Sequence, residues 1–450
     1  MAETAPAAAL PLSHARVLKI SLPIMLAAMT TPLIGVVDTG VVGQIPEAEP
    51  IAAVGVGAII LSAIYWIYGF LRMGTTGLTA QAAGQGNRAE VAALLTRALM
   101  IGLAGGVVFI LVQPLLYRGA FAVSPASEEV EGLARGYMSI RIWSAPAAIA
   151  IYGITGWLIA QERARAVLVL QLWMNGANMG LDVLFVLGLG WGVNGVAFAS
   201  FLAEWSGLAM GLWLCRAAFR HPSWRDWARV FDRARLRRMA AVNGDILIRS
   251  ALLQVVFVSF LLFGGRFGDE TLAANQVLLQ FLYVTGYALD GFAFAAEALV
   301  GQAFGAGAVD RVRRAAQLTT FWATVTALIL SLVFWLGGPG FIDILTKAPE
   351  VQVLARAFLP WMIAAPVMQI GLTMLDGIFI GATRSADMRN MMVVAVICYL
   401  GAVWLFTPLW ANHGLWLALH VSFAARGLSL MARYPALEKA VRAEARPKAS

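Results

Sequence analysis

Long runs of apolar residues separated by short polar segments make up most of the chain. Each run is close to the roughly 20 residues that an α-helix needs to cross about 30 Å of hydrocarbon. Strands of a membrane barrel would show alternating segments of about ten residues instead, so the runs predict helices. The twelve predicted spans are 18–43, 51–73, 91–116, 137–160, 165–188, 191–215, 240–264, 272–300, 314–338, 358–381, 390–410 and 412–432.

The loops between these runs alternate in charge. Every second loop carries arginines, most densely between residues 216 and 239, whereas the other loops are acidic or neutral, as at Glu47 and Glu129. Lys and Arg accumulate on the cytoplasmic side of a membrane protein, so both termini are expected in the cytoplasm. The opening residues lack the order of a signal peptide, and the first run is expected to remain as the first span. We therefore predict a multi-pass protein of the bacterial inner (plasma) membrane.

A shift of 221 residues aligns the two halves of the chain. It places the segment 81–86, QAAGQG, on 302–307, QAFGAG, and it places Gly156 on Gly377. The shift covers six predicted helices, an even number, so both halves have the same orientation in the membrane. Such parallel repeats are related by a pseudo-two-fold axis along the membrane normal.

The repeat predicts an all-α fold of two six-helix bundles that enclose a central cleft. The expected parts are a cytoplasmic N-terminal segment (1–17), an N-lobe (18–215), a basic cytoplasmic linker (216–239), a C-lobe (240–432) and a basic cytoplasmic tail (433–450). The linker is expected to form an amphipathic helix on the inner membrane face, with Trp224, Trp227, Val230 and Phe231 on its apolar side. A charged connection between lobes is the simpler interpretation of the linker, and a regulatory role is the alternative.

Composition excludes several classes of protein. Only 13% of the residues are charged and 60% are hydrophobic, whereas a soluble domain carries about 25% charged residues. The two cysteines, the four scattered histidines and the lack of nucleotide or metal motifs argue against an enzyme or a cofactor. The net charge of +8 is assigned to anionic lipid on the cytoplasmic face and not to nucleic acid.

Ionisable side chains within apolar runs are costly and therefore mark functional sites. In the N-terminal half we single out Asp38 and Asp182, which lie at similar predicted depth. Asn178 lies one helical turn before Asp182, and Asn175 and Ser200 extend the group. Two neighbouring carboxyl groups in a dry environment could carry a proton, or they could ligate a hard cation such as Na⁺ with Asn178. A polar cluster that only fixes helix packing is the alternative.

In the C-terminal half, the candidates are Asp290 and Glu297 on the eighth run, Asp376 on the tenth and Arg249 on the seventh. Arg249 is expected to pair with Glu297 or Asp376, because an unpaired charge inside a bilayer is costly. These residues could couple ions, and a structural ion pair is at least as plausible.

Two further sets of residues bear on movement and substrate. Pro23 removes a hydrogen bond within the first run and favours a bend, which makes it a hinge candidate, with a static kink as the simpler interpretation. Polarizable and aromatic side chains suit varied apolar cations. The candidates for lining the cleft are Met25, Met29, Tyr283, Tyr287, Met368 and Met374.

The sequence resembles the multidrug and toxic compound extrusion (MATE) transporters, and among them the DinF-like bacterial branch most closely. The segments that carry the resemblance are VVDTGVVGQ, IAAVGVGA, NGANMGLDVLFVLGLGWGVNGVAFAS, NGDILIRS, DGFAFAAEALVGQAFGAG and DGIFIGATR. The resemblance implies a V-shaped, two-lobed exporter that expels organic cations and other toxic compounds in exchange for H⁺ or Na⁺.

By position, the resemblance implies an ion or proton site at Asp38, Asn178, Asp182 and Ser200, where serine replaces a threonine common in the family. Pro23 matches a first-helix proline implicated in bending.

A sodium-site pattern known from the C-lobe of another branch is met only in part, because Asp376 is present but the nearest acid on the seventh run is Asp245. We therefore predict a monomeric exporter of amphipathic or cationic small molecules that works by alternating access and antiports H⁺ in preference to Na⁺. The alternative is a flippase or exporter of a lipid-linked or other amphipathic metabolite, which would need more cleft arginines than Arg249.

Overall fold

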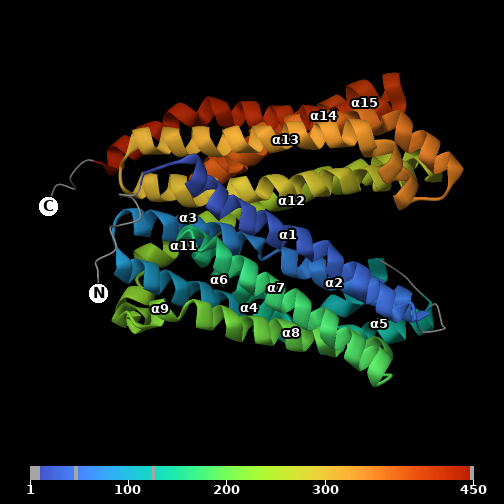
Figure 1. Cartoon of the computed structure of the whole chain (residues 1–450), viewed down its shortest axis with the longest axis horizontal. Helices are drawn as coiled ribbons and strands as arrows, with labels where there is room; N and C mark the ends of the chain where they lie inside the picture. Colours follow the sequence, from blue (N-terminus) through green and yellow to red (C-terminus); the bar gives the residue numbers. More distant parts are fainter. Residues whose placement is uncertain (1–10, 45–48, 124–126, 446–450) are drawn as a thin grey trace. The chain divides into compact units, whose positions relative to one another are not determined.

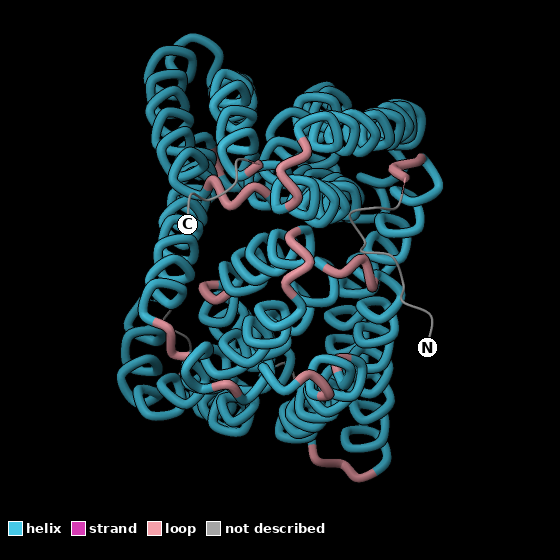
Figure 2. Tube along the Cα trace, turned by 90° about the vertical axis from the view of Figure 1, so that its left-hand side faces the viewer, coloured by secondary structure: helices cyan, strands magenta, loops and turns pink. Residues whose placement is uncertain are grey.

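Helices fill the part of the chain that the computed structural model describes, residues 11–44, 49–123 and 127–445, and these residues include no strand (Figure 1, Figure 2). Nine helical stretches in this part are long and apolar enough to cross a membrane. The all-α polytopic fold predicted from hydropathy is therefore confirmed. Three charges used in the prediction, those of Glu47, Arg446 and Lys448, lie outside the described residues.

Each of the twelve predicted spans falls largely on helix, although a turn at residues 67 and 68 interrupts the span 51–73. The helices are α1 (His14–Val42), α2 (Glu49–Trp66), α3 (Gly69–Gly84), α4 (Arg88–Val123), α5 (Glu128–Arg141), η2 (Ile142–Ser144), α6 (Ala145–Ala160), α7 (Ala164–Asp182), η3 (Val183–Gly188), α8 (Gly192–Leu214), α9 (Arg216–Phe219), η4 (Pro222–Arg225), α10 (Trp227–Val230), α11 (Arg233–Gly264), η5 (Gly265–Phe267), α12 (Asp269–Gly305), α13 (Val309–Leu345), α14 (Pro349–Gly381) and α15 (Ser385–Glu444). The backbone of α15 departs from helical geometry at Trp410 and Ala411, between the last two predicted spans. The number of membrane crossings stays a prediction.

Contacts within the chain define two compact units. The N-unit contains Leu26–Thr79 and Asn87–Arg237, and the C-unit contains Met1–Met25, Ala80–Gly86 and Arg238–Ser450. In the N-unit, α4 packs along α6, α7 along α8 and α2 on α5. In the C-unit, α12 packs on α13 and α14, and α14 packs on α15.

A buried amide pair stabilises the C-unit at the break in α15. Asn275 on α12 and Asn412 on α15 exchange two hydrogen bonds of 2.8 and 2.9 Å, and the Trp416 indole also donates to Asn275 Oδ1. All three side chains are buried beside Phe260 in the apolar core. The two amides therefore satisfy one another within the apolar core.

The two halves of the chain repeat the same turn geometry at the predicted shift. Gly86 and Gly307, with φ of 70° and 67°, differ by 221 positions. Glu162 and Thr383, with φ of 58° and 50°, also differ by 221 positions. A positive φ is uncommon for residues other than glycine, so its recurrence at the same shift supports the internal repeat.

The two units also repeat the same close helix contact. A Cβ atom on Gly156 would lie 2.3 Å from the Arg72 carbonyl oxygen, and one on Gly377 would lie 2.5 Å from the Ala293 carbonyl oxygen. Both members of each pair correspond at the shift of 221. Glycine is required at both places because the backbones approach too closely for any side chain.

The repeated glutamine–glycine segments themselves cross within the C-unit. A Cβ atom on Gly84 would lie 2.0 Å from the Gln302 carbonyl oxygen, and one on Gly305 would lie 2.1 Å from the Gln81 carbonyl oxygen. The contact is reciprocal, as expected for two copies of one motif. Gln81 also donates to the Gly381 carbonyl at 3.2 Å. These contacts explain why the end of α3 groups with the C-terminal half.

The predicted single amphipathic helix in the linker is wrong. The segment forms three short turns, α9, η4 and α10, before α11 begins. Pro222 lacks a backbone N–H and starts η4, while the Asp226 side chain accepts from the Arg229 N–H and starts α10 afresh. Trp227 and Phe231 are exposed as expected for an apolar side, but Val230 is buried against the protein.

The linker is fastened to the start of α4. Arg97, buried at 2% exposure, donates from Nε to the Val230 carbonyl at 2.9 Å and from Nη2 to the Arg229 carbonyl at 2.7 Å. Thr96 donates to the Trp224 carbonyl at 2.7 Å. Three hydrogen bonds to main-chain carbonyls thus hold the linker without a regular helix.

Candidate functional site

Asp38 and Asp182 lie side by side in the N-unit. Each carboxyl group is within hydrogen-bonding range of the other. Among the described residues, however, no N–H or O–H donor reaches Asp38 Oδ1 or either oxygen of Asp182. A hydrogen bond between two carboxyl groups requires a proton on one of them. The pair predicted from sequence is therefore brought together, and it lacks the partners that a purely structural carboxylate would have.

The backbone around Asp182 is irregular. Asp182 is fully buried at the last position of α7, and the π-helical turn η3 follows it at once. Such turns insert an extra residue per turn and are frequent at functional sites.

Asn178 and Ser200 bond to each other next to the carboxyl pair in sequence. Asn178 Nδ2 donates to Ser200 Oγ at 3.0 Å, and both side chains are buried. Asn175 instead donates to Thr30 Oγ1 at 2.7 Å, one turn along α7. The polar face predicted on α7 therefore joins α1 through Asn175 and α8 through Asn178.

An ion pair that the sequence analysis missed lies in the same unit. Arg141 at the end of α5 pairs with Glu204 on α8 at 2.8 Å, with side-chain exposures of 14% and 16%. Arg141 acts electrostatically on both aspartates. The Tyr65 hydroxyl donates to the Arg141 carbonyl at 3.1 Å, where α5 tightens into the 3₁₀ turn η2.

The signal for this pair was present in the sequence. Glu204 lies inside the predicted span 191–215, and a complete count of ionisable residues in the spans would have found it. Arg141 lies near the start of the span 137–160, where a charge is commonly taken as interfacial.

The charges around Asp38 do not balance. Three carboxyl groups, those of Asp38, Asp182 and Glu204, share the cationic Arg141. The described part of the chain has no cluster of three or more His, Cys, Asp or Glu side chains suited to a metal ion. Carboxyl groups in this arrangement can accept a proton or contribute oxygen ligands to a cation.

The C-unit contains a different charged cluster. Asp376 on α14 accepts hydrogen bonds from Arg249 on α11 and from Arg426 on α15, and all three side chains are buried. The pairing predicted for Arg249 is confirmed, with Asp376 as the partner. Arg426 was missed although it lies inside the predicted span 412–432. A carboxylate held by two guanidinium groups is typical of a structural link.

The other acids of the C-unit lie apart from one another along α12. Glu297 is buried, and its carbonyl oxygen would lie 2.5 Å from a Cβ on Gly381. Asp290 is half-buried and acts electrostatically on Tyr287. Asp245, weighed above as a sodium-site acid, accepts from Ser385 Oγ at 2.9 Å and pairs with Arg389. Asp245 is thus tied to the start of α15.

The candidate hinge Pro23 is half-buried within α1, which is helical from His14 to Val42. The division between the two units passes just after Met25. A role of Pro23 as a hinge stays a prediction.

The candidates for a substrate cleft differ in exposure. Met29 and Tyr283 are 53% and 48% exposed, Met25 and Tyr287 are half-buried, and Met368 is 36% exposed. Met374 is only 2% exposed, so its assignment to the cleft lining is wrong because it packs in the core of the C-unit. The role of the others stays a prediction.

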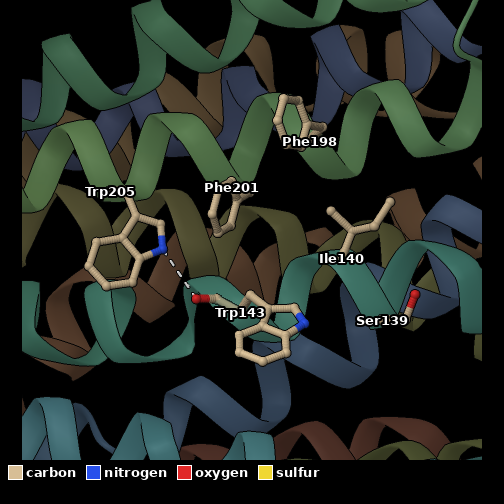
Figure 3. A pocket seen from close by; sticks show the side chains of 6 residues that line it. All are labelled: Ser139, Ile140, Trp143, Phe198, Phe201 and Trp205. Atoms are coloured by element: carbon tan, nitrogen blue, oxygen red, sulfur yellow. Dashed lines mark hydrogen bonds between the residues drawn. The ribbon is translucent and has the colours of Figure 1, made fainter.

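An aromatic groove flanks the Arg141–Glu204 pair in sequence. It encloses about 400 Å³ and is lined by Ser139, Ile140, Trp143, Phe198, Phe201 and Trp205 (Figure 3). The Trp205 indole donates to the Trp143 carbonyl at 3.1 Å, and both rings remain partly exposed. Among the described residues, those that line this groove are uncharged, and all but Ser139 are apolar or aromatic.

Comparison with known proteins agrees with this fold. The MatE family matches residues 23–184 and 246–409. The chain is 39% identical to the DNA damage-inducible protein F of Escherichia coli (strain K12), covering 92% of this chain and 90% of that protein. It is 26% identical to a probable multidrug resistance protein NorM of Synechocystis, covering 93% of both. A crystal structure of MATE in the bent conformation superposes with a TM-score of 0.85 at 18% identity, over 96% of this chain and 97% of that chain. The chain therefore belongs to the MatE family of multidrug and toxic compound efflux transporters, which are not enzymes.

Proposed function

We propose that this transporter exports amphipathic or cationic toxic compounds by antiport with H⁺, and that Asp38 and Asp182 carry the proton. The observation that supports this most is the pair of adjacent carboxyl groups without donors in the described part of the chain. A proton on either group would complete their hydrogen bond. Its loss would leave two like charges together in a dry site, which is unfavourable.

The environment favours H⁺ over Na⁺ at this site. A hard cation needs several oxygen ligands around it, whereas a proton needs one carboxyl oxygen and one acceptor. The Asn178 amide is already bonded to Ser200. The positive charge of Arg141 acts on both aspartates and disfavours a second bare cation beside them.

Proton binding could drive transport through α1. Asp38 lies on α1, and Asn175 links α7 to Thr30 of the same helix. Loading or unloading the carboxyl pair would therefore change the contacts of α1, and Pro23 provides a weak point in its hydrogen bonding. Such a shift is the step that alternating access requires.

The competing flippase function finds little support. Arg249, the arginine considered for binding a pyrophosphate group, is engaged with Asp376. Asp376 also holds Arg426, so this cluster does not offer its cations to an anionic substrate.

The test uses purified protein reconstituted into liposomes that contain a fluorescent lipophilic cation. We expect an imposed pH gradient, and not an imposed Na⁺ gradient, to drive transport of the cation. Asp38→Asn and Asp182→Asn should each abolish transport with the protein still folded, because an amide cannot exchange a proton at neutral pH.

Asp343→Asn is the matched control, because Asp343 is an acid at the exposed end of α13 that pairs with Arg356. It should transport like the wild type. Full transport by Asp38→Asn would remove Asp38 from the coupling role, and transport driven equally by a Na⁺ gradient would refute proton specificity.

A further inference from the structure

A basic cavity of about 300 Å³ lies in the N-unit, where α6 and α8 end and the linker begins. Its wall is formed by Trp157, Gln161, Arg163, Leu214, Arg216, Ala217 and Arg220. None of these residues is acidic. Arg163 precedes α7 and Asp182 ends it, so roughly 27 Å of helix separates the cavity from the aspartate pair.

The arginines of the cavity are held in place but not neutralised. Arg163 donates to the Leu214 carbonyl at 2.7 Å. Arg216 donates to the Trp213 carbonyl at 3.1 Å and stacks 4.2 Å from the centre of the Trp213 ring. Within the described ranges, neither of them nor Arg220 forms an ion pair with a carboxylate. A guanidinium group has five donors, so both anchored arginines keep donors for a ligand.

A buried donor without an acceptor lies in the same wall. Gln161 Nε2 is inaccessible to solvent and has no hydrogen-bond partner in the part of the chain that the structure describes. Such groups are rare because desolvation is not repaid. An oxygen atom of a ligand in the cavity would satisfy it once the Gln161 side chain turns toward the cavity.

The remaining wall is apolar. Trp157 and Leu214 are buried, and the Trp157 indole is already bonded to the Val91 carbonyl at 2.8 Å. The cavity therefore combines a cationic rim with an apolar side, at the end of helices that are apolar enough to cross a membrane.

We propose that this cavity binds a phosphate oxyanion supplied by the headgroup of an anionic phospholipid. The arginines would pair with the phosphate oxygens, since guanidinium groups match phosphate geometry. Gln161 would donate to a further oxygen, and Trp157 with Leu214 would contact the glycerol and acyl part. Basic pockets at the membrane ends of helices bind lipid headgroups in this way. The inference does not depend on the coupling ion or the exported substrate.

A simpler role would be helix capping. Arg163 and Arg216 satisfy carbonyl groups at the end of α8, as cations near a helix C-terminus often do. Capping accounts for neither Arg220, nor the unpartnered Gln161 amide, nor the cavity itself.

The test is native mass spectrometry of the full-length protein, purified with equal amounts of phosphatidylglycerol and phosphatidylcholine. The wild type should retain phosphatidylglycerol preferentially. Arg216→Gln and Arg220→Gln should each weaken this retention about tenfold, the effect of losing one charge-assisted hydrogen bond. Arg220 is exposed and its side chain makes no hydrogen bond within the described residues, so Arg220→Gln should fold even if a capping variant does not.

Arg165→Gln is the matched control, since Arg165 is exposed on the first turn of α7 and does not line the cavity. It should retain phosphatidylglycerol like the wild type. If Arg165→Gln lost as much phosphatidylglycerol as the cavity variants, the retention would come from diffuse surface charge, and the proposed site would be overturned. If both cavity variants retained phosphatidylglycerol like the wild type, helix capping would be the only role left for the arginines, and the proposal would again be overturned. Displacement of phosphatidylglycerol by millimolar inorganic phosphate would support the oxyanion site and overturn its assignment to a lipid.

Discussion

Asp182 is expected to take part in proton coupling and, at the same time, to lower the stability of the folded protein. Both of its oxygens are buried without a donor in the described part of the chain, and an unsatisfied buried group costs roughly 1–3 kcal/mol. An asparagine brings donors and removes a charge. We therefore expect Asp182→Asn to melt at or above the wild-type temperature while losing transport, a trade-off common at functional sites. Thermal unfolding of the purified protein together with a liposome assay checks both parts, and a variant that melts well below the wild type would mean that Asp182 is a structural residue.

Arg141 and Glu204 should behave in the opposite way. Removing one partner leaves a buried charge uncompensated, which costs about 3–5 kcal/mol. Arg141→Gln should therefore melt far below the wild type, and the double variant Arg141→Gln with Glu204→Gln should recover part of the loss, because Asp38 and Asp182 would still lack the charge of Arg141. The exposed pair Glu131–Arg135 supplies the control, because Arg135→Gln should cost less than about 1 kcal/mol. If Arg141→Gln were as stable as Arg135→Gln, the pair would be dispensable to the fold.

Sequence reasoning located individual charged residues better than their partners. Asp38 and Asp182 could be matched because each lies on an outward-running span at a depth that residue counting gives. The partner of Arg249 could be narrowed to two acids, one of which is Asp376. The sequence could not decide between them, because depth in the membrane does not give the rotation of one helix against the next. Arg426 and Glu204 were visible as charges inside spans, yet only packing shows which groups they neutralise.

The close crossing of α3 and α12 requires glycine at two positions. Hydropathy does not reveal this requirement. Gly84 and Gly305 each face a carbonyl oxygen at about 2 Å from where a Cβ would lie. Alanine at either place must push the helices apart, and overpacking of this kind typically costs 1–3 kcal/mol. We expect Gly84→Ala and Gly305→Ala to lower the melting temperature and to slow transport.

Gly244 on α11 provides the comparison for this crossing. A Cβ there would meet no atom within 4 Å among the described residues, and alanine favours helix over glycine by about 1 kcal/mol. Gly244→Ala should therefore keep or raise the melting temperature. Equal behaviour of the three alanine variants would show that the close approach of α3 and α12 carries no energetic weight.

Helices with a strong apolar pattern were predicted well, and irregular segments were not. The twelve apolar runs fall largely on helix, because a bilayer lets the backbone pair its polar groups only in helices or closed barrels, and the runs lack the alternation of barrel strands. The linker failed as a single helix because Pro222 and Asp226 interrupt it. Both residues are recognisable local signals for the end or the start of a helix. The prediction gave more weight to the amphipathic composition of the segment.

The internal repeat is the feature of the architecture that the sequence predicted in most detail. A single shift of 221 anticipated repeated turns at Glu162 and Thr383 and repeated glycine contacts at Gly156 and Gly377. The same shift places Asp38 on Ser259 and Asp376 on Thr155, so the sequence also indicates that charge is distributed differently in the two halves. The N-unit holds two adjacent acids without donors in its described part, whereas Asp376 in the C-unit is held by two arginines. A duplicated scaffold thus supports one site suited to proton exchange and one suited to structural linkage.

The orientation of the whole molecule in the membrane follows from its arginines and can be tested directly. The linker carries many of them, and the first turn of α5 is acidic, so the linker should face the cytoplasm and the start of α5 the outside. In a variant with Cys215 and Cys398 replaced by alanine, Glu129→Cys should react with a membrane-impermeant maleimide in intact cells. Arg225→Cys should react only after the membrane is permeabilised. The reverse pattern would invert the topology and would contradict the orientation inferred from the arginines.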